Sequence, residues 1–402
     1  KVAQMAPFSA QSSQDPRELW KFLAQYEKAT DGEVLAIPHN SNLSGGMMFP
    51  DNTVDGNPID VGYARMSARW EPLAEVTQVK GDSETHPILS PDDEFADFET
   101  FDTNLGLKKT KENKLKHDYA RGALKQGLLY QQKFQVNPYK FGMIGSTDGH
   151  NSLSTPEEDN FFGKFVESEP RSERTSSKLA GDRLWENWRI SASGYAAVWA
   201  TENTREALFA AMKRKEVYAT TGSRIRVRFF GGWEYTDSMI DKPNYEELGY
   251  RYGVPMGGDL INGGVKKSPT FMFSASKDPL GANLDRIQIV KGWLDKRGQL
   301  HEKVYNVAWA GARVPDEKTG FLRPIGSTVS EEDATYDNSI GDYHLSGIWT
   351  DPDFDEGQRS FYYCRVIEIP RPRWTLKDAV FFDIMLPDEV PKVIQDRAYT
   401  SP

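Results

Sequence analysis

Residues 141–150 read Phe-Gly-Met-Ile-Gly-Ser-Thr-Asp-Gly-His, and this stretch governs our interpretation of the fold. Its first half is apolar, which indicates a short buried β-strand, and its second half is a polar loop directly after the strand. Asp148 and His150 lie two residues apart, so both side chains can point the same way from the strand end. A carboxylate and an imidazole in this position favour a divalent-metal site, and an ordinary surface turn is the alternative.

The same arrangement occurs twice upstream of this stretch. Residues 33–38 (EVLAIP) read as a short buried strand, and His39 follows it in a polar cluster. Residues 73–79 (LAEVTQV) read as another strand, and the loop after it contains Glu84 and His86. The sequence therefore predicts several strands that each deliver polar side chains at their ends.

Helices are predicted between these strands. Asp15 is a suitable N-cap with Pro16 at the first helical position, and Asn203 with Glu206 forms a second helix-start signal. A further strand leads to Arg224 through Thr-Gly-Ser. Strands that alternate with helices predict parallel βαβ units, which bind ligands beyond the carboxyl ends of their strands.

Two other regions have a different character. Residues 87–112 are acidic and irregular, and we interpret them as a solvated loop, with a cation site as the alternative. After about residue 222, short alternating apolar runs are separated by Gly, Pro, Asn and Asp. This pattern predicts an antiparallel sandwich or barrel.

The composition excludes some classes of partner. The chain has 402 residues, a net charge of -10 and no apolar run long enough to span a bilayer, so we expect neither nucleic acid nor membrane as a partner. Cys364 is the single cysteine, so no disulfide forms within the chain. The sequence starts at Lys1 without a signal-peptide pattern, and we expect a targeting segment to have been lost upstream.

His39, Asp148 and His150 form the best candidate metal site. Oxygen and nitrogen ligands without thiolate suit Zn, Mn or Fe, which activate bound water. Glu84 and His86 are candidates for further ligands or for acid–base catalysis, and a capped loop histidine is the alternative for His86. A structural histidine is the alternative for His39. Arg224 is a candidate contact for an anionic substrate, with a plain surface arginine as the alternative.

Several motifs resemble the PHP (polymerase and histidinol phosphatase) superfamily. They are AIPHN at 36–40, GSTDGH at 145–150 and EVYATTGSR at 216–224. Longer stretches, such as KGDSETHPILSPDDEFADFE and RPRW, resemble a bacterial PHP-like family of unassigned function. The resemblance implies a distorted seven-stranded β/α barrel with a bi- or trinuclear metal centre that hydrolyses phosphoesters. It also implies that His39 is the middle histidine ligand and that Asp148 and His150 are the closing ligands.

One feature of that superfamily is absent from the chain. An H-x-H pair opens the PHP barrel, and no H-x-H occurs in this sequence. We therefore expect an upstream piece of the barrel to have been cut away or to exist as a separate polypeptide that acts as a partner. In that case the chain alone holds part of the site.

These observations predict residues 1–222 to be a partial PHP-type β/α barrel and residues 223–402 to be a β-rich, sandwich-like accessory domain. The predicted function is that of a metal-dependent hydrolase, foremost a phosphoesterase for a small anionic substrate. An ester, amide or sulfate is an alternative bond. The rival interpretation is a non-catalytic ligand- or carbohydrate-binding protein. A periplasmic or secreted location is expected, with the cytoplasm as the alternative.

Overall fold

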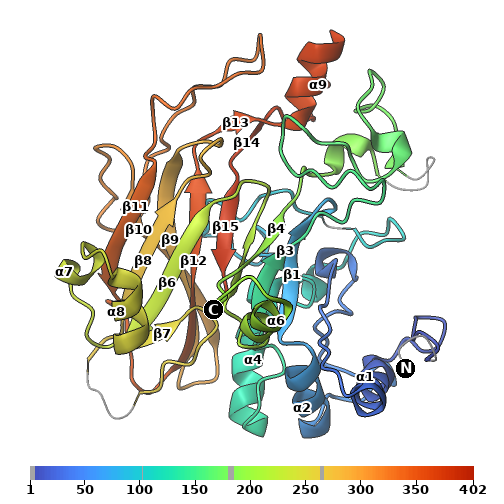
Figure 1. The fold of residues 1–402 in the computed structure, drawn as a ribbon, viewed down its shortest axis with the longest axis vertical. Helices are drawn as coiled ribbons and strands as arrows, with labels where there is room; N and C mark the ends of the chain where they lie inside the picture. The colour runs from blue at the N-terminus through green and yellow to red at the C-terminus, as the bar shows by residue number, and fades with distance from the viewer. Residues whose placement is uncertain (1–4, 102, 180–184, 263–266) are drawn as a thin grey trace.

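The computed structural model describes residues 5–101, 103–179, 185–262 and 267–402 (Figure 1). The strands of the first half are β1 (Leu73–Gln78), β2 (Gly81–Asp82), β3 (Gly142–Gly145), β4 (Tyr195–Val198) and β5 (Val217–Thr220). Those that follow are β6 (Arg226–Gly232), β7 (Gly253–Pro255), β8 (Thr270–Ser276), β9 (Leu284–Leu294), β10 (Leu300–Trp309), β11 (His344–Thr350), β12 (Arg359–Glu368), β13 (Arg371–Pro372), β14 (Val393–Ile394) and β15 (Arg397–Thr400).

The helices surround these strands. They are α1 (Pro16–Thr30), α2 (Val61–Trp70), α3 (Glu112–Leu115), α4 (Ala120–Phe134), α6 (Arg205–Lys213), α7 (Asp237–Ile240), α8 (Tyr245–Tyr252) and α9 (Trp374–Phe382). Short 3-10 turns lie at Ser41–Leu43, Val166–Ser168 and Asn187–Arg189. Within the described residues, no helix is both long and apolar enough to cross a bilayer.

Two antiparallel sheets enclose the largest apolar core. The six-stranded sheet has the order β10-β9-β12-β15-β5-β4, and the four-stranded sheet has the order β11-β8-β6-β7 (Figure 1). Phe229, Phe271 and Phe273 of the smaller sheet pack against Ile287 and Val366 of the larger one. Because side chains alternate along a strand, the neighbours of these residues on β9 and β12 face the opposite side.

That opposite side is covered by the first half of the chain. Ala123 and Leu124 of α4 pack in one cluster with Val290 of β9 and Tyr363 of β12. The three-stranded sheet β2-β1-β3 contributes Val76 to the same cluster. The six-stranded sheet is therefore the middle layer of three, and it takes β4 and β5 from before residue 222 and its other strands from after it.

The predicted β/α barrel is wrong. In the described part of the chain β1 and β3 form the parallel pair, all other strand pairs are antiparallel, and no sheet closes. The chain folds back from β1 into the hairpin strand β2, and β4 and β5 pair antiparallel although α6 lies between them. The other edge of β5 is occupied by β15 from the end of the chain. Strand–helix alternation therefore did not mean parallel crossovers here.

Local helix signals were more informative than the order of the elements. Asp15 caps α1 by accepting a hydrogen bond from the backbone N–H of Arg17 at 2.9 Å, and Pro16 is the first helical residue, as predicted. The predicted cap of α6 was off by one residue, because Thr204 rather than Asn203 accepts the hydrogen bond from Ala207. Capping acts within one turn, so its signal survives any tertiary arrangement.

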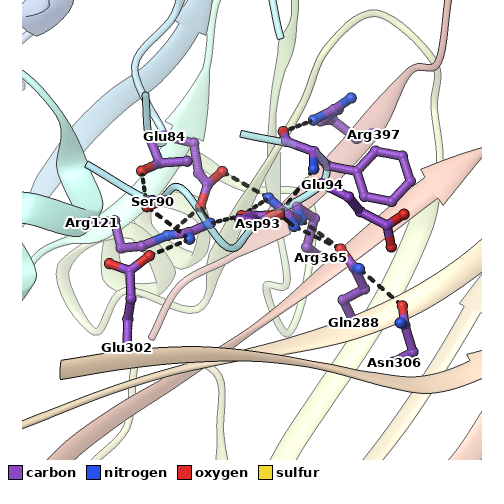
Figure 2. Close-up of polar contacts among 12 residues, drawn as sticks. Glu84, Ser90, Asp93, Glu94, Arg121, Gln288, Glu302, Asn306, Arg365 and Arg397 are labelled. Carbon is purple, nitrogen blue, oxygen red and sulfur yellow. Dashed lines mark hydrogen bonds and ion pairs between the residues drawn. The ribbon is translucent and has the colours of Figure 1, made fainter. Parts of the chain in front are cut away.

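A buried ion network joins the first half of the chain to the middle sheet (Figure 2). Arg121 of α4 and Arg365 of β12 both have side chains that are 0% exposed. Arg365 binds both oxygens of Asp93, at 2.9 and 2.6 Å, and Arg121 donates to the same carboxylate at 2.8 Å. Glu84 also accepts from Arg121 at 3.0 Å and from Arg365 at 3.2 Å. Two loop carboxylates are thus shared by two arginines from different layers.

The network is closed at its ends by further polar groups. Glu302 of β10 accepts from Arg121 at 2.9 Å, and Gln288 of β9 accepts from Arg365 at 2.9 Å. Burial alone raises the pKa of Asp93, but the charges of Arg365 and Arg121 outweigh it and lower that pKa strongly. The Asp93 carboxylate is therefore ionised, and its arginine partners offset the cost of burying its charge.

Removal of one arginine from this network should destabilise the protein strongly. We expect Arg365→Met to lower the free energy of unfolding by about 3–5 kcal/mol, because it leaves Asp93 and Glu84 buried with one partner fewer. Urea denaturation measures the change. The matched control is Arg69→Met, since Arg69 is 63% exposed and pairs with Glu27 at 2.8 Å; we expect it to cost less than about 1 kcal/mol. Equal effects of the two substitutions would contradict a structural role for the network.

Candidate functional site

Three extended segments end at the same edge of the three-stranded sheet. β1 and β3 run parallel, and residues 36–38 continue the layer beside β1. The backbone N–H of Ala36 donates to the Trp70 carbonyl at 2.7 Å, and that of Glu75 donates to the Pro38 carbonyl at 2.9 Å. The predicted strand at 33–38 is thus an extended segment rather than a regular strand. His39 and the loop of Asp148 follow neighbouring segments and lie toward one edge.

Asp148 is the centre of a polar cluster at this edge. Its carboxylate accepts from the Nζ atom of Lys80 and, at 2.5 Å, from that of Lys164. The Nε2 atom of His150 lies 2.9 Å from the other oxygen, and Lys164 Nζ lies 3.1 Å from the same nitrogen. We call Lys80, Asp148, His150 and Lys164 the strand-end cluster. Its lysine side chains are 7% and 5% exposed, whereas that of His150 is 50% exposed, so the cluster opens to solvent through the imidazole.

The backbone around the cluster is held in uncommon conformations. Asn40 and Asp148 have φ angles of 55° and 53°, in the left-handed region that few residues other than glycine adopt. Glu75 of β1 ties the two loops together, since it accepts from the Asn40 backbone N–H at 3.1 Å and from the Ser146 hydroxyl. Residues held in such conformations occur preferentially at active and ligand-binding sites.

The two lysines are unusual in their electrostatics. Burial is the largest effect on both, and it lowers the pKa of Lys80 and that of Lys164 below the ordinary lysine value. Repulsion between the two ammonium groups adds to the lowering of the pKa of Lys80, while the negative charge of Glu75 acts in the opposite direction. Burial and both lysines also lower the pKa of His150, so its imidazole is neutral at pH 7. Perturbed groups in mutual contact identify a functional-site candidate.

Glu84 and His86, predicted to act in catalysis, lie elsewhere. Glu84 belongs to the buried ion network, and its side chain is 2% exposed (Figure 2). His86 is buried against the ring of Tyr119, and its Nδ1 atom accepts from the Ile88 backbone N–H at 3.2 Å. The geometry gives both residues structural contacts in the loop after β2.

Arg224 lies beside a separate group of residues. Its side chain is 61% exposed, donates to the Tyr195 hydroxyl at 3.3 Å and lies 3.8 Å from Glu157. The structure describes no hydrogen bond or ion pair from Arg224 to Asp148 or His150. Among the six predicted site residues, the structure therefore brings Asp148 and His150 into contact, with His39 exposed on the same edge.

The donors of the strand-end cluster do not fit a metal ion. No group of three or more His, Cys, Asp or Glu side chains with suitable geometry occurs among the described residues. Asp148 and His150 supply two donors, but two ammonium groups already occupy the carboxylate. A divalent cation at this position would face two positive charges within direct contact of its main ligand. This arrangement of donors does not support metal binding by His39, Asp148 and His150, which stays an untested prediction from the sequence.

Sequence reasoning missed Lys80 and Lys164. The one signal for Lys80 was its position directly after the predicted strand at 73–79, the same kind of position that Asp148 and His39 occupy. No sequence signal pointed to Lys164, since it lies in a polar segment that is typical of a surface loop. Its contact with Asp148 depends on how residues 151–168 fold back onto β3, and the backbone N–H of His150 donates to the Lys164 carbonyl at 2.7 Å.

The fold is a layered arrangement of open, mainly antiparallel sheets with helices, and a lysine-rich cluster lies at a strand edge. Residues 1–402 match the model of one family, described as protein of unknown function (DUF3604). The chain belongs to this family. No curated protein and no solved structure matches it.

The predicted membership of the PHP superfamily is wrong. The family that matches is DUF3604 and not a PHP family, and no sheet of the described residues closes into a barrel. The motifs that carried the resemblance are short polar sequences after strands. Such sequences arise wherever a strand ends at a functional edge, so they do not specify the barrel. The expectation of a family without an assigned function is compatible with the match.

A second buried group of carboxylates lies near Arg224, around Arg371. Glu158, Glu368 and Asp396 are all less than about a tenth exposed, and Arg371 pairs with Asp396 at 2.5 Å. Burial is the main cause that raises the pKa of Glu158 and of Glu368 to about 8, and the Asp396 charge adds to both shifts while Arg371 opposes them. The folded protein therefore holds protons here at neutral pH.

These protons should make stability depend on pH. The ordinary pKa of a glutamate is 4.5 and that of folded Glu368 is about 8, so between these values the unfolded chain releases protons that the folded protein keeps. Stability should thus fall as the pH rises through this window. Glu368→Gln should flatten the fall, because the amide cannot ionise and can still accept the Ser223 hydroxyl hydrogen bond.

Urea denaturation between about pH 5 and about pH 9 tests this expectation. The exposed Glu389→Gln is the matched control and should leave the slope unchanged. A wild-type slope retained in Glu368→Gln would show that other groups carry the pH dependence.

Competition between lysines and a cation at Asp148 is also testable. We expect Lys80→Met with Lys164→Met to raise the affinity for Zn²⁺ by about tenfold or more, because the carboxylate and His150 then become free to bind it. Titration calorimetry measures the affinity, and Lys296→Met, which frees the partly exposed Asp355, is the control. Tight stoichiometric Zn²⁺ binding by the wild type that is lost in His39→Ala, Asp148→Ala would instead establish the metal site predicted from the sequence.

Proposed function

We propose that the protein is a hydrolase of small anionic esters, phosphoesters foremost, and that the strand-end cluster is its reaction centre. The contact between Asp148 and His150 carries this proposal. A carboxylate that accepts from one imidazole nitrogen fixes the orientation of the ring and leaves the other nitrogen free as a base. His150 is half exposed, so its free nitrogen is accessible to water and substrate.

The reaction follows from these positions. With the Nε2 proton donated to Asp148, the Nδ1 atom of His150 accepts a proton from a water molecule. The resulting hydroxide attacks phosphorus, the bond to the leaving oxygen breaks, and that oxygen takes the proton back from Nδ1. One ester and one water thus give one acid and one alcohol.

The lysines have two roles in this scheme. Lys80 and Lys164 hold Asp148 in place, and Lys164 lies 3.1 Å from His150 Nε2, where its charge opposes protonation of the ring. Together they place two positive charges against one carboxylate, which favours an anionic substrate at the open side of the cluster. The phosphoester preference rests on this charge.

An activity panel tests the proposal. The substrates are p-nitrophenyl phosphate, bis-p-nitrophenyl phosphate, p-nitrophenyl sulfate and the neutral p-nitrophenyl acetate. We expect a phosphoester to be cleaved fastest, and His150→Gln to lower kcat/KM by about 100-fold or more, because the base is lost.

The chain offers a close control. His301 lies 2.9 Å from Asp295 through Nε2 and is 42% exposed, so this pair matches the Asp148–His150 contact at a distant hairpin. His301→Gln should leave kcat/KM within about twofold of the wild type. No cleavage of any ester, or full activity in His150→Gln, would refute the proposal. Activity that requires added Zn²⁺ or Mn²⁺ would show that a cation displaces the lysines.

A further inference from the structure

An aromatic-lined cavity lies at the opposite end of β3 from the strand-end cluster. It has a volume of about 520 Å³ and is bounded by α4, β6, β8 and the start of β12. It reaches Phe141 at the amino end of β3, whereas Asp148 follows the carboxyl end of that strand. Its volume is within the range of pockets that bind small molecules.

Aromatic rings make up much of the wall. Trp233, Phe271, Phe354, Phe361 and Tyr362 all line the cavity. Phe271 and Tyr362 have ring centroids 4.5 Å apart, and Trp233 meets Phe354 edge to face at 5.9 Å. Four of the five, all except Phe271, are only partly buried, so they leave ring surface that an apolar ligand can cover.

Lys215 introduces a positive charge into this apolar wall. It follows α6 with φ of 64° and is partly buried. Gly257, with φ of 79°, leaves room for it, since a Cβ there would clash with the backbone of Lys215. The nearby Lys140 pairs with Asp259, and no described carboxylate forms an ion pair with Lys215. Burial lowers the pKa of Lys215, and the charge of Lys140 adds to the shift.

We propose that this cavity binds a small aromatic carboxylate, with the ring against the aromatic wall and the carboxylate at Lys215. One unpaired ammonium group matches one negative charge. The other charged residues of the lining balance in sign, since Lys140 pairs with Asp259 and Arg359 is accompanied by Glu356, so Lys215 supplies the excess positive charge. The site is independent of the proposed hydrolase centre.

Calorimetric titration with 2-naphthoate tests the proposal, with the neutral 2-naphthamide as a ligand of the same shape. We expect 2-naphthoate to bind the wild type with one site and about tenfold or more tightly than the amide, because the charge-assisted contact is lost in the amide. Lys215→Met should abolish this preference, and Lys215→Arg, which keeps the charge, should retain it.

Lys303→Met is the matched control, since Lys303 does not line the cavity and pairs with Asp353 on the surface. It should bind 2-naphthoate as the wild type does. Thermal unfolding shows whether each variant is folded, and the Lys215→Arg result stands if Lys215→Met is not. No binding of 2-naphthoate, equal affinity for the amide, or an unchanged preference in folded Lys215→Met would overturn the proposal.

Discussion

The structure depends on two arginines that share carboxylates deep in the protein. Arg121 and Arg365 come from different layers, and Asp93 and Glu84 come from the irregular loop between β2 and α3. That loop has little regular structure of its own, so backbone pairing does not fix it. Burial of four charges is tolerated only because each is paired several times, and this requirement selects one position of the loop relative to the middle sheet.

What could be predicted from the sequence was mainly local. The start of α1 follows from Asp15 and Pro16, because a cap and its helix are in contact along the chain. The pairing of β5 with β15 could not be predicted, since Ala398 meets Thr220 across most of the second half of the chain. Apolar patterns show that a strand is buried but not which strand lies beside it. The predicted barrel failed for this reason.

The contrast between local and remote contacts also decides which site residues could be predicted. Asp148 and His150 could be predicted because residues two positions apart at a strand end point the same way. The acidic run at 92–99 was interpreted as a solvated loop, yet Asp93 is buried, because its partner Arg365 is remote in sequence. Whether a carboxylate is solvated, catalytic or structural depends on what faces it. Glu84 illustrates this, since a strand-end position suggested catalysis and two arginines give it a structural role.

The network and the strand-end cluster are connected through one hairpin. Lys80 lies at its turn and Glu84 just after its second strand, so the ion network restrains the chain a few residues from the lysine that holds Asp148. Gly81, with φ of 89°, lets the turn pass the Glu99 carbonyl and the Phe101 ring, where a Cβ would clash. We therefore expect a change in the network to reach the strand-end cluster through the hairpin backbone at Lys80. In the proposed hydrolase, Arg121 and Arg365 would thus be positioning residues that act through Lys80.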